Sequence, residues 1–508
     1  MHRIPWAVFV LSCLLCAEAS ACARLQVFED RDGDGRRDAA ERAMPGVRVS
    51  DGERIGVTDA DGRHAWADGA PAGPVFVIKP AGHAVPRGPD GLPAFWRGGA
   101  RGCGPVGMVP APAADALEVL VFADPQPKHM RDVAHVRTDV IDPLAGRAGA
   151  QLGITLGDVV HGDLTLYPAL VADIARLGVP WLHVAGNHDM DKPVRDDATS
   201  LDTFRRTFGP DTFAWEEAQA NVVVLDDVIG APDGYTGGLR EAQFRFLEAY
   251  LATMPRDRLL VVTLHIPLFD TAPGRETFRR TDRERLFALL RDVPDVLVLS
   301  GHAHTQRHVM HGTATGWHGA RPLHEYNVGA VSGAFWSGVA DAAGVPDATM
   351  ADGTPNGHAR LTVRADRSYA LRWIPARVDA SLAAMRLHAP AVLRQGAFPA
   401  FGVFANVWMG RDDTPVEMRV DGGPWRPMQR VERADPWLAA ENARDDAAPA
   451  LRGHDRSPEA IASPHLWRGT LPTDLAIGEH VVEVRAMDAW QGEQRATTRY
   501  RLEAAPAP

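Results

Sequence analysis

The pattern of hydrophobic and polar residues changes twice along this chain, which predicts three structural units. Residues 24–113 hold short runs with alternating apolar and polar positions, such as "GVRVSDG" and "GPVFVIKP", separated by Gly, Pro and Asp. Such alternation between turn residues is typical of a small all-β sandwich. Similar runs return after residue 345, including "PVEMRVDGG" and "GEHVVEVRAMDAW". We therefore expect β-sandwich domains over residues 24–113 and 346–508.

Residues 114–345 have nearly continuous apolar runs instead: "LEVLVFAD", "LGITLGD", "PWLHVAGN", "NVVVLDD", "RLLVVTLH" and "DVLVLSGH". Segments with helical periodicity lie between several of them, such as "LYPALVADIARLG" and "REAQFRFLEAYLATM". Buried strands that alternate with amphipathic helices predict an α/β unit whose sheet is covered on both faces. After it, "GHARLTVRADRSYALRWIPAR" predicts a β-hairpin leading into the C-terminal domain, and "ENARDDAAPALRGHDRSPEA" predicts a long loop there.

The first residues predict a signal peptide. A weakly basic start precedes the apolar stretch "IPWAVFVLSCLLCA", and the small residues of "AEASACA" follow it, as at a secretory cleavage site. The cleavage site could be Ala19-x-Ala21 or Ala21-x-Ala23, and Cys22 stays in the mature protein only with the first. We expect residues 1–23 to be removed and the protein to be periplasmic or secreted. The alternative is a lipoprotein with its lipid on Cys22, although Ala19 stands where a lipobox usually has a larger aliphatic residue. No other stretch is long and apolar enough for a transmembrane helix.

The composition narrows the range of partners. The 508 residues carry a formal net charge of −11, which argues against a nucleic-acid partner held through its phosphates. Cys22 and Cys103 could form a disulfide in an oxidising compartment, but the sequence alone leaves this pairing open.

Most of the apolar runs of the middle unit end in a side chain that can bind a metal. These candidate ligands are Asp124, Gln126, Asp158, Asn187, His188, Asp189, His265, His302 and His304. Ligand sites of open α/β sheets lie beyond the carboxyl ends of strands, so the scattered segments can converge. Carboxylate, amide and imidazole donors suit divalent cations. So many donors fit two ions about 3.5–4 Å apart that share a carboxylate.

The ordered motifs "DPQ", "GD", "GNHD", His265 and "GHAH" resemble those of the calcineurin-like metallophosphoesterases. The resemblance spans residues 117–345 and implies a metallophosphoesterase-type β-sandwich covered by helices. The flanking segments resemble the N- and C-terminal β domains of one bacterial exported branch. The resemblance implies one ion held by Asp124, Gln126, Asp158 and His304, and a second held by Asp158, Asn187, His265 and His302. It makes His188 the general acid or a donor to the phosphoryl oxygen.

Two positions depart from the usual family pattern. Gln126 stands where His is commonest, and a neutral amide oxygen is a weaker ligand than imidazole. The motif "GD-x-x-D" here reads "GDVVHGD", so that either His161 or Asp163 could orient His188; we favour Asp163.

The expected activity is hydrolysis of a phosphomonoester or phosphodiester by attack of a metal-bridging hydroxide, with Mn, Fe or Zn as the two divalent ions. The substrate would be a small or medium phosphorylated molecule. The alternative is a cell-envelope or glycan-binding protein whose phosphoesterase domain is weak or inactive. The oligomeric state does not follow from the sequence.

A second acidic motif lies in the N-terminal domain. "DRDGDGRRDAAE" has the spacing of a Ca²⁺ loop, with Gly35 at its sixth position. The five acidic positions are Asp30, Asp32, Asp34, Asp38 and Glu41. The flanking sequence predicts strands rather than the helices of an EF-hand, and "TDADGRHAW" resembles the closing hairpin of surface-protein B-type repeats. Structural calcium and a solvated acidic turn are both consistent with this loop.

Overall fold

The computed structural model describes residues 22–505 except residues 68, 72, 113, 273 and 378–383. Apart from Cys22 and Ala23, the expected signal peptide lies outside the described residues. None of the helices in the described part is long and apolar enough to cross a bilayer.

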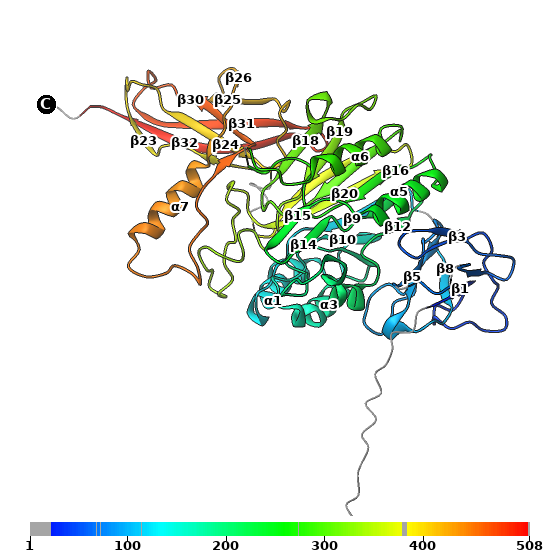
Figure 1. Cartoon of the computed structure of the whole chain (residues 1–508). Coiled ribbons are helices and arrows are strands. Elements are labelled where there is room, and N and C mark those ends of the chain that lie inside the picture. Colours follow the sequence, from blue (N-terminus) through cyan, green and yellow to red (C-terminus); the bar gives the residue numbers. More distant parts are fainter. Residues whose placement is uncertain are drawn as a thin grey trace, which may run out of the picture.

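The central unit is a sandwich of two sheets, with helices on their outer faces (Figure 1). The first sheet, in spatial order, consists of β11 (Trp181–Val184), β10 (Leu152–Leu156), β9 (Ala116–Phe122), β20 (Gly357–Arg364) and β21 (Tyr369–Pro375). The second consists of β12 (Phe213–Glu216), β13 (Ala220–Val224), β16 (Leu259–Thr263), β17 (Val296–Ser300), β19 (Leu323–Asn327) and β18 (Arg307–His311). All six apolar runs form strands, and the expected α/β sandwich is confirmed.

The connections carry the helices and one hairpin. The helices are α1 (Met130–Val136), which continues through a π-helical turn (Arg137–Ile141) into α2 (Asp142–Leu144), then α3 (Tyr167–Ala175), α4 (Asp202–Phe208), α5 (Glu241–Thr253) and α6 (Arg280–Leu290). The hairpin consists of β14 (Val228–Ala231) and β15 (Gly234–Gly237). Within each sheet the central strands are parallel, so their carboxyl ends share one edge.

The central unit extends further along the chain than we predicted. The β20–β21 hairpin, expected to lead into the C-terminal domain, pairs antiparallel with β9 and completes the first sheet. Its inward side chains Ala359, Leu361 and Val363 are buried. The backbone of β20 pairs with the free edge of β9, and its buried side chains join the core of the sandwich. The central unit therefore ends after Pro375 instead of residue 345.

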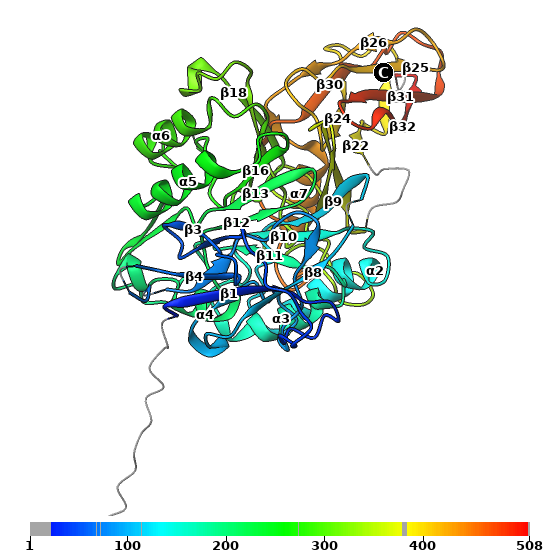
Figure 2. The ribbon, with the colours of Figure 1, turned by 90° about the vertical axis from the view of Figure 1, so that its right-hand side faces the viewer.

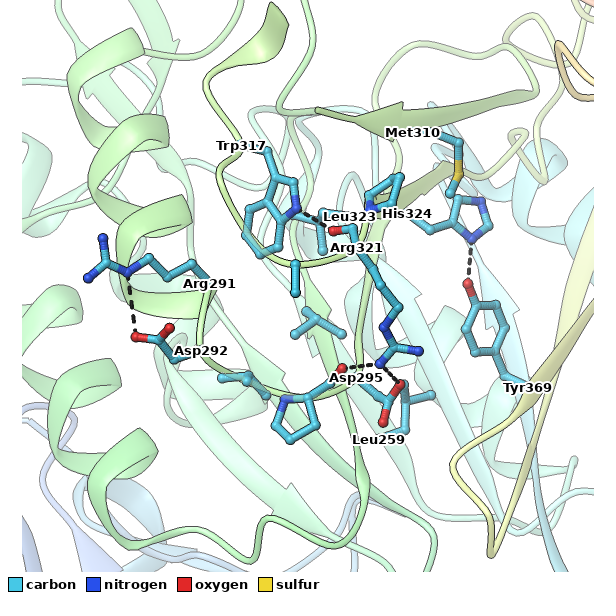
Figure 3. A pocket seen from close by; sticks show the side chains of 15 residues that line it. Leu259, Arg291, Asp292, Asp295, Met310, Trp317, Arg321, Leu323, His324 and Tyr369 are labelled. Carbon is cyan, nitrogen blue, oxygen red and sulfur yellow. Dashed lines mark hydrogen bonds and ion pairs between the residues drawn. The ribbon is translucent and has the colours of Figure 1, made fainter. Parts of the chain in front are cut away.

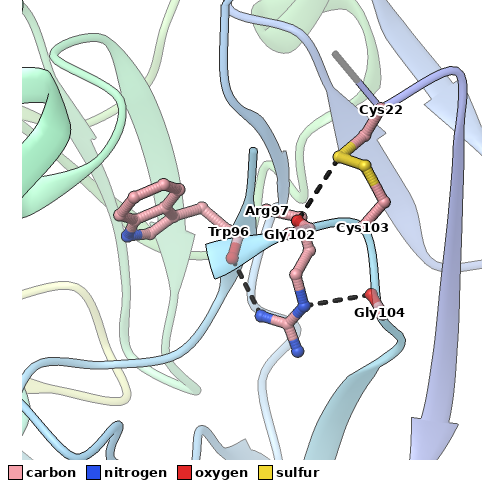
Figure 4. Close-up of a disulfide and its surroundings, with 6 residues drawn as sticks. All are labelled: Cys22, Trp96, Arg97, Gly102, Cys103 and Gly104. Carbon is pink, nitrogen blue, oxygen red and sulfur yellow. Dashed lines mark hydrogen bonds between the residues drawn. A yellow bond between two sulfur atoms is a disulfide. The ribbon is translucent and has the colours of Figure 1, made fainter. Parts of the chain in front are cut away.

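The N-terminal domain is built from two four-stranded sheets, as expected for a β-sandwich. Its strands are β1 (Arg24–Glu29), β2 (Arg48–Ser50), β3 (Ile55–Val57), β4 (Arg63–Ala65), β5 (Val75–Val77), β6 (His83–Ala84), β7 (Trp96–Arg97) and β8 (Val106–Pro110). A disulfide joins Cys22 to Cys103, with the Cα atoms 5.3 Å apart (Figure 4). The pairing that the sequence left open is therefore present, and it ties the start of β1 to the segment before β8.

The N-terminal domain packs against the edge strand β12 of the central unit (Figure 2). The backbone N–H of Glu216 donates to the carbonyl of Lys79 at 2.9 Å. The buried ammonium group of Lys79 donates back to the Glu216 carbonyl at 2.8 Å and pairs with Glu217 at 2.7 Å. Phe76 lies edge-on to Phe213 beside this pair. The contact covers a sheet edge that would otherwise be open to other strands.

The C-terminal domain is also a two-sheet sandwich, and it contacts a different side of the central unit (Figure 1). The strands of the sandwich are β22 (Met385–His388), β23 (Val392–Arg394), β24 (Gly402–Val407), β25 (Val416–Val420), β26 (Arg426–Pro427), β27 (Gln429–Arg430), β30 (Leu466–Thr470), β31 (Gly478–Asp488) and β32 (Gly492–Glu503). β28 (Arg433–Ala434) and β29 (Ala462–Ser463) pair in a separate two-stranded sheet. The loop expected around residues 441–460 instead begins inside a helix, α7 (Pro436–Ala447). Asp435 caps this helix by accepting from the N–H groups of Trp437 and Leu438, and Pro436 suits its first turn.

Candidate metal centre

Five strand ends bring the candidate ligands together. Asp124 and Gln126 follow β9, Asp158 follows β10, Asn187 follows β11, His265 follows β16, and His302 and His304 follow β17. Ligand atoms of Asp158, His265 and His302 lie within 4.8 Å of one another. Both sheets therefore contribute to one site, at the shared edge where parallel strands end.

Asp158 is the centre of this arrangement. Its carboxylate accepts from Gln126 Nε2 at 2.5 Å and from the backbone N–H of His188 at 2.8 Å. His265 Nε2 lies 3.4 Å from Asp158 Oδ1. Burial opposes ionisation of Asp158, but His265 and His188 hold its pKa below the usual range. The carboxylate is thus ionised and touches both halves of the site.

His265 is oriented by a hydrogen bond on its far side. Its Nδ1 lies 2.9 Å from the carbonyl oxygen of Leu156, which fixes Nδ1 as the donor and turns Nε2 inward. The inward Nε2 is 3.1 Å from Asn187 Oδ1 and 3.2 Å from His302 Nδ1. Burial opposes a charge on His265, but Asp158 raises its pKa to about 10. This cluster contains the set expected for the second ion.

The residues expected to hold the first ion are arranged in a similar way, because a backbone carbonyl orients the histidine here as well. His304 Nδ1 donates to the carbonyl of Gly333 at 2.6 Å, and its Nε2 lies 3.5 Å from Asp124 Oδ1. Asp124 Oδ2 accepts from the backbone N–H of His302 at 2.9 Å. Asp124 Oδ1 and Gln126 Oε1 are buried without a hydrogen-bond partner in the described residues.

Two such orphaned buried oxygens are costly in a folded protein unless a ligand satisfies them. They lie among carboxylate, amide and imidazole donors, the chemistry that divalent cations select. The residues present therefore fit a metal pair, with Asp124, Gln126 and His304 on one side of Asp158 and Asn187, His265 and His302 on the other.

The backbone of the site is strained. Five of the ligand residues have φ between 41° and 71°, namely Asp124, Gln126, Asp158, His302 and His304. Residues other than glycine adopt this left-handed region at a cost, and such strain gathers at functional sites. The conformation turns several donors at the ends of β9, β10 and β17 toward a common centre.

His161, and not Asp163, lies beside His188. The two imidazole rings stack with centroids 4.1 Å apart and planes 20° from parallel. The carboxylate of Asp163, which we had favoured, is exposed and accepts from the N–H and hydroxyl of Thr165 at 3.1 and 2.6 Å. The side chain of Asp163 is engaged locally, because it caps the 3₁₀ turn Leu164–Leu166 that follows it. His161 therefore takes the orienting place.

We expect His161→Ala to lower kcat about tenfold, as for other groups that orient a reacting side chain, because His188 would lose its stacking partner. His161→Phe should retain most of the activity, since a ring still packs on His188. Asp163→Ala is the matched variant from the same loop and should stay within about threefold of the wild type. Steady-state kinetics on all three would reverse the assignment if Asp163→Ala were the impaired enzyme.

Two buried carboxylates support the site: Asp189, which the sequence placed among the candidate ligands, and Asp227, which it did not single out. Asp189 accepts from the backbone N–H groups of Val159 and Gly186 and from the hydroxyl of Tyr167. Asp227 accepts from the N–H groups of His265 and the next residue, at 3.0 and 2.9 Å. Burial raises the pKa of Asp227 to about 8. Both residues fasten ligand loops to each other; the doublet "DD" after β13 was the sequence signal for Asp227.

Aromatic residues border the site. Trp336 is buried and donates from Nε1 to the carbonyl of Pro125 at 2.9 Å, so it is a packing residue. Its neighbour Phe335 is 43% exposed and lies over His304, with ring centroids 4.5 Å apart. Tyr235, in β15, is edge-on to His302 at 5.9 Å. The sequence did not single out Phe335 or Tyr235.

A cavity of about 500 Å³ lies elsewhere in the central unit (Figure 3). Leu259 and Val296, the first residues of β16 and β17, line it, so it opens at the end of the sheet opposite the metal ligands. Arg321 in its wall pairs with Asp295 at 2.5 Å. It is separate from the metal centre.

The acidic loop of the N-terminal domain folds around its own backbone. Carboxylate oxygens of Asp30, Asp32 and Glu41 lie within 4.8 Å of one another. Asp30 is buried and accepts from the N–H groups of Gly33 and Gly35 at 2.8 and 2.9 Å. Three of the five predicted positions therefore meet, whereas Asp34 accepts from a following backbone N–H group and Asp38 is exposed.

Comparison with known proteins agrees with this geometry. Residues 117–306 match the family model of the calcineurin-like phosphoesterases, and residues 325–493 match a model for the C terminal of calcineurin-like phosphoesterase. A probable cyclic nucleotide phosphodiesterase from Rhodopseudomonas palustris is 30% identical over 155 residues, which are 30% of this chain and 56% of that protein. The chain thus spans about half the length of this curated relative.

Solved structures also align with the chain. A dimetal phosphatase from Danio rerio is 15% identical, with a TM-score of 0.34, over 50% of this chain and 98% of that one. A purple acid phosphatase from yellow lupin is 13% identical, with a TM-score of 0.38, over 66% and 68%. The two family models together match most of the central and C-terminal parts of the chain, including the segments that form the site. The chain therefore belongs to the calcineurin-like phosphoesterases, a family of metal-dependent enzymes.

Proposed function

We propose that this protein is an exported phosphoesterase that hydrolyses phosphomonoesters or phosphodiesters at a centre for two divalent ions. The observation that carries the proposal is the pair of orphaned oxygens, Asp124 Oδ1 and Gln126 Oε1, beside the cluster of Asp158, His265 and His302. When bound there, Mn, Fe or Zn ions activate water and neutralise charge on the phosphoryl oxygens.

Side chains and backbone groups of the protein itself hold the ligands and His188 in place. Asp158 holds the two halves together, while Leu156 and Gly333 fix the rings of His265 and His304 through their carbonyls. His188 is anchored by its N–H to Asp158 and packed on His161. We propose that it donates a proton to the leaving oxygen, or else a hydrogen bond to the phosphoryl group.

The test is hydrolysis by the purified protein, stripped of metal and then loaded separately with Mn, Fe and Zn. p-Nitrophenyl phosphate, its bis ester and a cyclic nucleotide separate monoesterase from diesterase activity. We expect turnover of at least one substrate that requires added metal. Binding of envelope glycans without metal-dependent turnover would favour the alternative of an inactive enzyme domain.

Export is supported by the disulfide, because such bonds persist in oxidising compartments. The same bond uses the sulfur of Cys22, which supports a mature protein without a lipid on that atom. The disulfide requires Cys22 in the mature protein, so we propose cleavage between Ala21 and Cys22, two residues before the boundary expected from the sequence, and location in the periplasm or medium. Mass spectrometry of the mature protein should find an N-terminus at Cys22 without a lipid and no free thiol; a diacylglyceryl mass on Cys22 would contradict this.

We further propose that the acidic loop binds structural Ca²⁺. Adding Ca²⁺ at about 100 times its Kd should stabilise the full chain by about 2.7 kcal/mol, seen as a higher melting temperature. Asp32→Asn should abolish this shift, whereas Asp61→Asn, in another acidic turn of the same domain, should retain it. The same shift in both variants would place the calcium elsewhere.

A further inference from the structure

The distribution of lysine in this chain is uneven. Of its 54 basic residues only three are lysines: Lys79, Lys128 and Lys192. Lys79 is buried against Glu217 at the N-terminal interface. The other two follow the first and third ligand segments, two residues after Gln126 and four after His188. Both therefore belong to loops that carry the metal centre.

The Lys128 side chain faces the catalytic side of its loop. The ammonium group of Lys128 lies 5.4 Å from the ring centroid of Phe335, which itself packs on His304 and His161. Burial lowers the pKa of both His161 and His188, and the nearby charge of Lys192 lowers both further; Lys128 adds to the effect on His161. Lys128 is half-buried and Lys192 exposed.

Neither Lys128 nor Lys192 forms an ion pair with a carboxylate of the described residues. In the part of the chain that the structure describes, Lys79 is the one lysine that forms an ion pair, although the protein has 65 acidic residues and many of its arginines are paired. A flexible ammonium group without a carboxylate remains free to bind an anion. Two such groups beside a site for a phosphoryl group supply positive charge that a second anion could contact.

Phe335 adds an apolar surface to the same mouth. Its side chain is 43% exposed, and its backbone has φ of 58°, a strained value for a bulky residue. An exposed aromatic face beside a cation suits a flat ring that carries a negative group.

We propose that Lys128, Lys192 and Phe335 form a substrate-binding rim that selects phosphoesters with an aromatic ester group bearing a second negative charge. This inference rests on the proposed phosphoesterase function and names the substrate class for that site. The phosphoryl group enters the metal centre, the ring lies on Phe335, and the second anion contacts the two ammonium groups. A carboxylate and a second phosphate share this chemistry.

The test compares two substrates of one shape, 3-carboxyphenyl phosphate and 3-carbamoylphenyl phosphate, or their methyl diesters if the enzyme prefers diesters. A 3-phosphonooxyphenyl analogue distinguishes a second phosphate from a carboxylate. We expect kcat/KM of the wild type to favour the anionic substrates about tenfold, and high salt to reduce this ratio. The double variant K128M/K192M should bring the ratio close to one, and K128R/K192R should restore it.

Arg499→Met removes one exposed positive charge from β32 in the C-terminal domain and is the control; it should leave the ratio unchanged. Phe335→Leu should lower turnover of both aryl substrates relative to an alkyl phosphate, by about threefold. A wild-type ratio near one, or a ratio that persists in K128M/K192M, would overturn the rim while leaving the phosphoesterase function intact.

A second measurement does not depend on turnover. With three lysines in the chain, acetylation by a water-soluble N-hydroxysuccinimide ester is easily mapped by mass spectrometry. The non-hydrolysable 3-carboxybenzylphosphonate should protect Lys128 and Lys192 from labelling in the metal-loaded protein, and its carbamoyl analogue should protect them less. Equal labelling with and without the phosphonate would contradict the rim, and absent hydrolysis of every substrate would contradict the proposed function instead.

Discussion

Replacing Asp158 by Asn should lower kcat by about a thousandfold or more, because this side chain is the expected bridge between two metal ions. Its carboxylate already contacts Gln126, His188 and His265 in the folded chain. An amide has the same shape but no negative charge, and its oxygen would be a weaker metal ligand than a carboxylate oxygen. Metal content should fall with activity, while the fold should survive because the packing volume is unchanged.

Asp257→Asn is the matched control for this change. Asp257 is 80% exposed and precedes β16, at the end of the sheet away from the ligands, so kinetics and metal content should match the wild type. Wild-type turnover in Asp158→Asn, measured with the metal that best activates the protein, would contradict the assignment of Asp158.

Replacing Lys79 by Met should lower the free energy of unfolding by about 3 kcal/mol, since it removes one partner of a buried ion pair. Lys79 is 1% exposed and binds both the carbonyl of Glu216 and the carboxylate of Glu217. Burial lowers the pKa of Lys79, and Glu217 opposes this. Without the ammonium group, Glu217 would remain half-buried beside Trp215 and an apolar interface.

The control is another ion pair between the same two units. Arg245 pairs with Glu53 at 2.5 Å, and both side chains are more than 40% exposed. Such surface pairs contribute little, so Arg245→Met should cost less than about 0.5 kcal/mol. Urea unfolding followed by circular dichroism gives both values. A loss in Lys79→Met no larger than that in Arg245→Met would mean that the N-terminal domain is not held through this contact.

The strands and ligand segments of the central unit could be predicted because buried parallel strands leave continuous apolar runs, and polar residues at their ends are conspicuous. The β20–β21 hairpin was misassigned for a physical reason. Its pairing with β9 joins segments far apart in the chain, as where Leu361 faces Val119, and local alternation does not name a partner. Helix α7 was missed because its Asp435 cap and Pro436 precede an acidic, alanine-rich stretch.

Side-chain direction in the site was the second limit. His161 and Asp163 are two residues apart, and a hydrogen bond to Thr165 decides which of them faces His188. Likewise, the positive φ of both Phe335 and Trp336 places the phenyl ring at the mouth and the indole in the interior. Neither choice is encoded in the hydrophobic pattern.

Anomalous diffraction from crystals of the Mn-loaded protein tests the central claim most directly, because it locates each ion without reference to activity. We expect two peaks about 3.5–4 Å apart, with Asp158 touching both, Gln126 and His304 on one, and Asn187 and His265 on the other. A single peak, or ions that Asp158 does not contact, would contradict it.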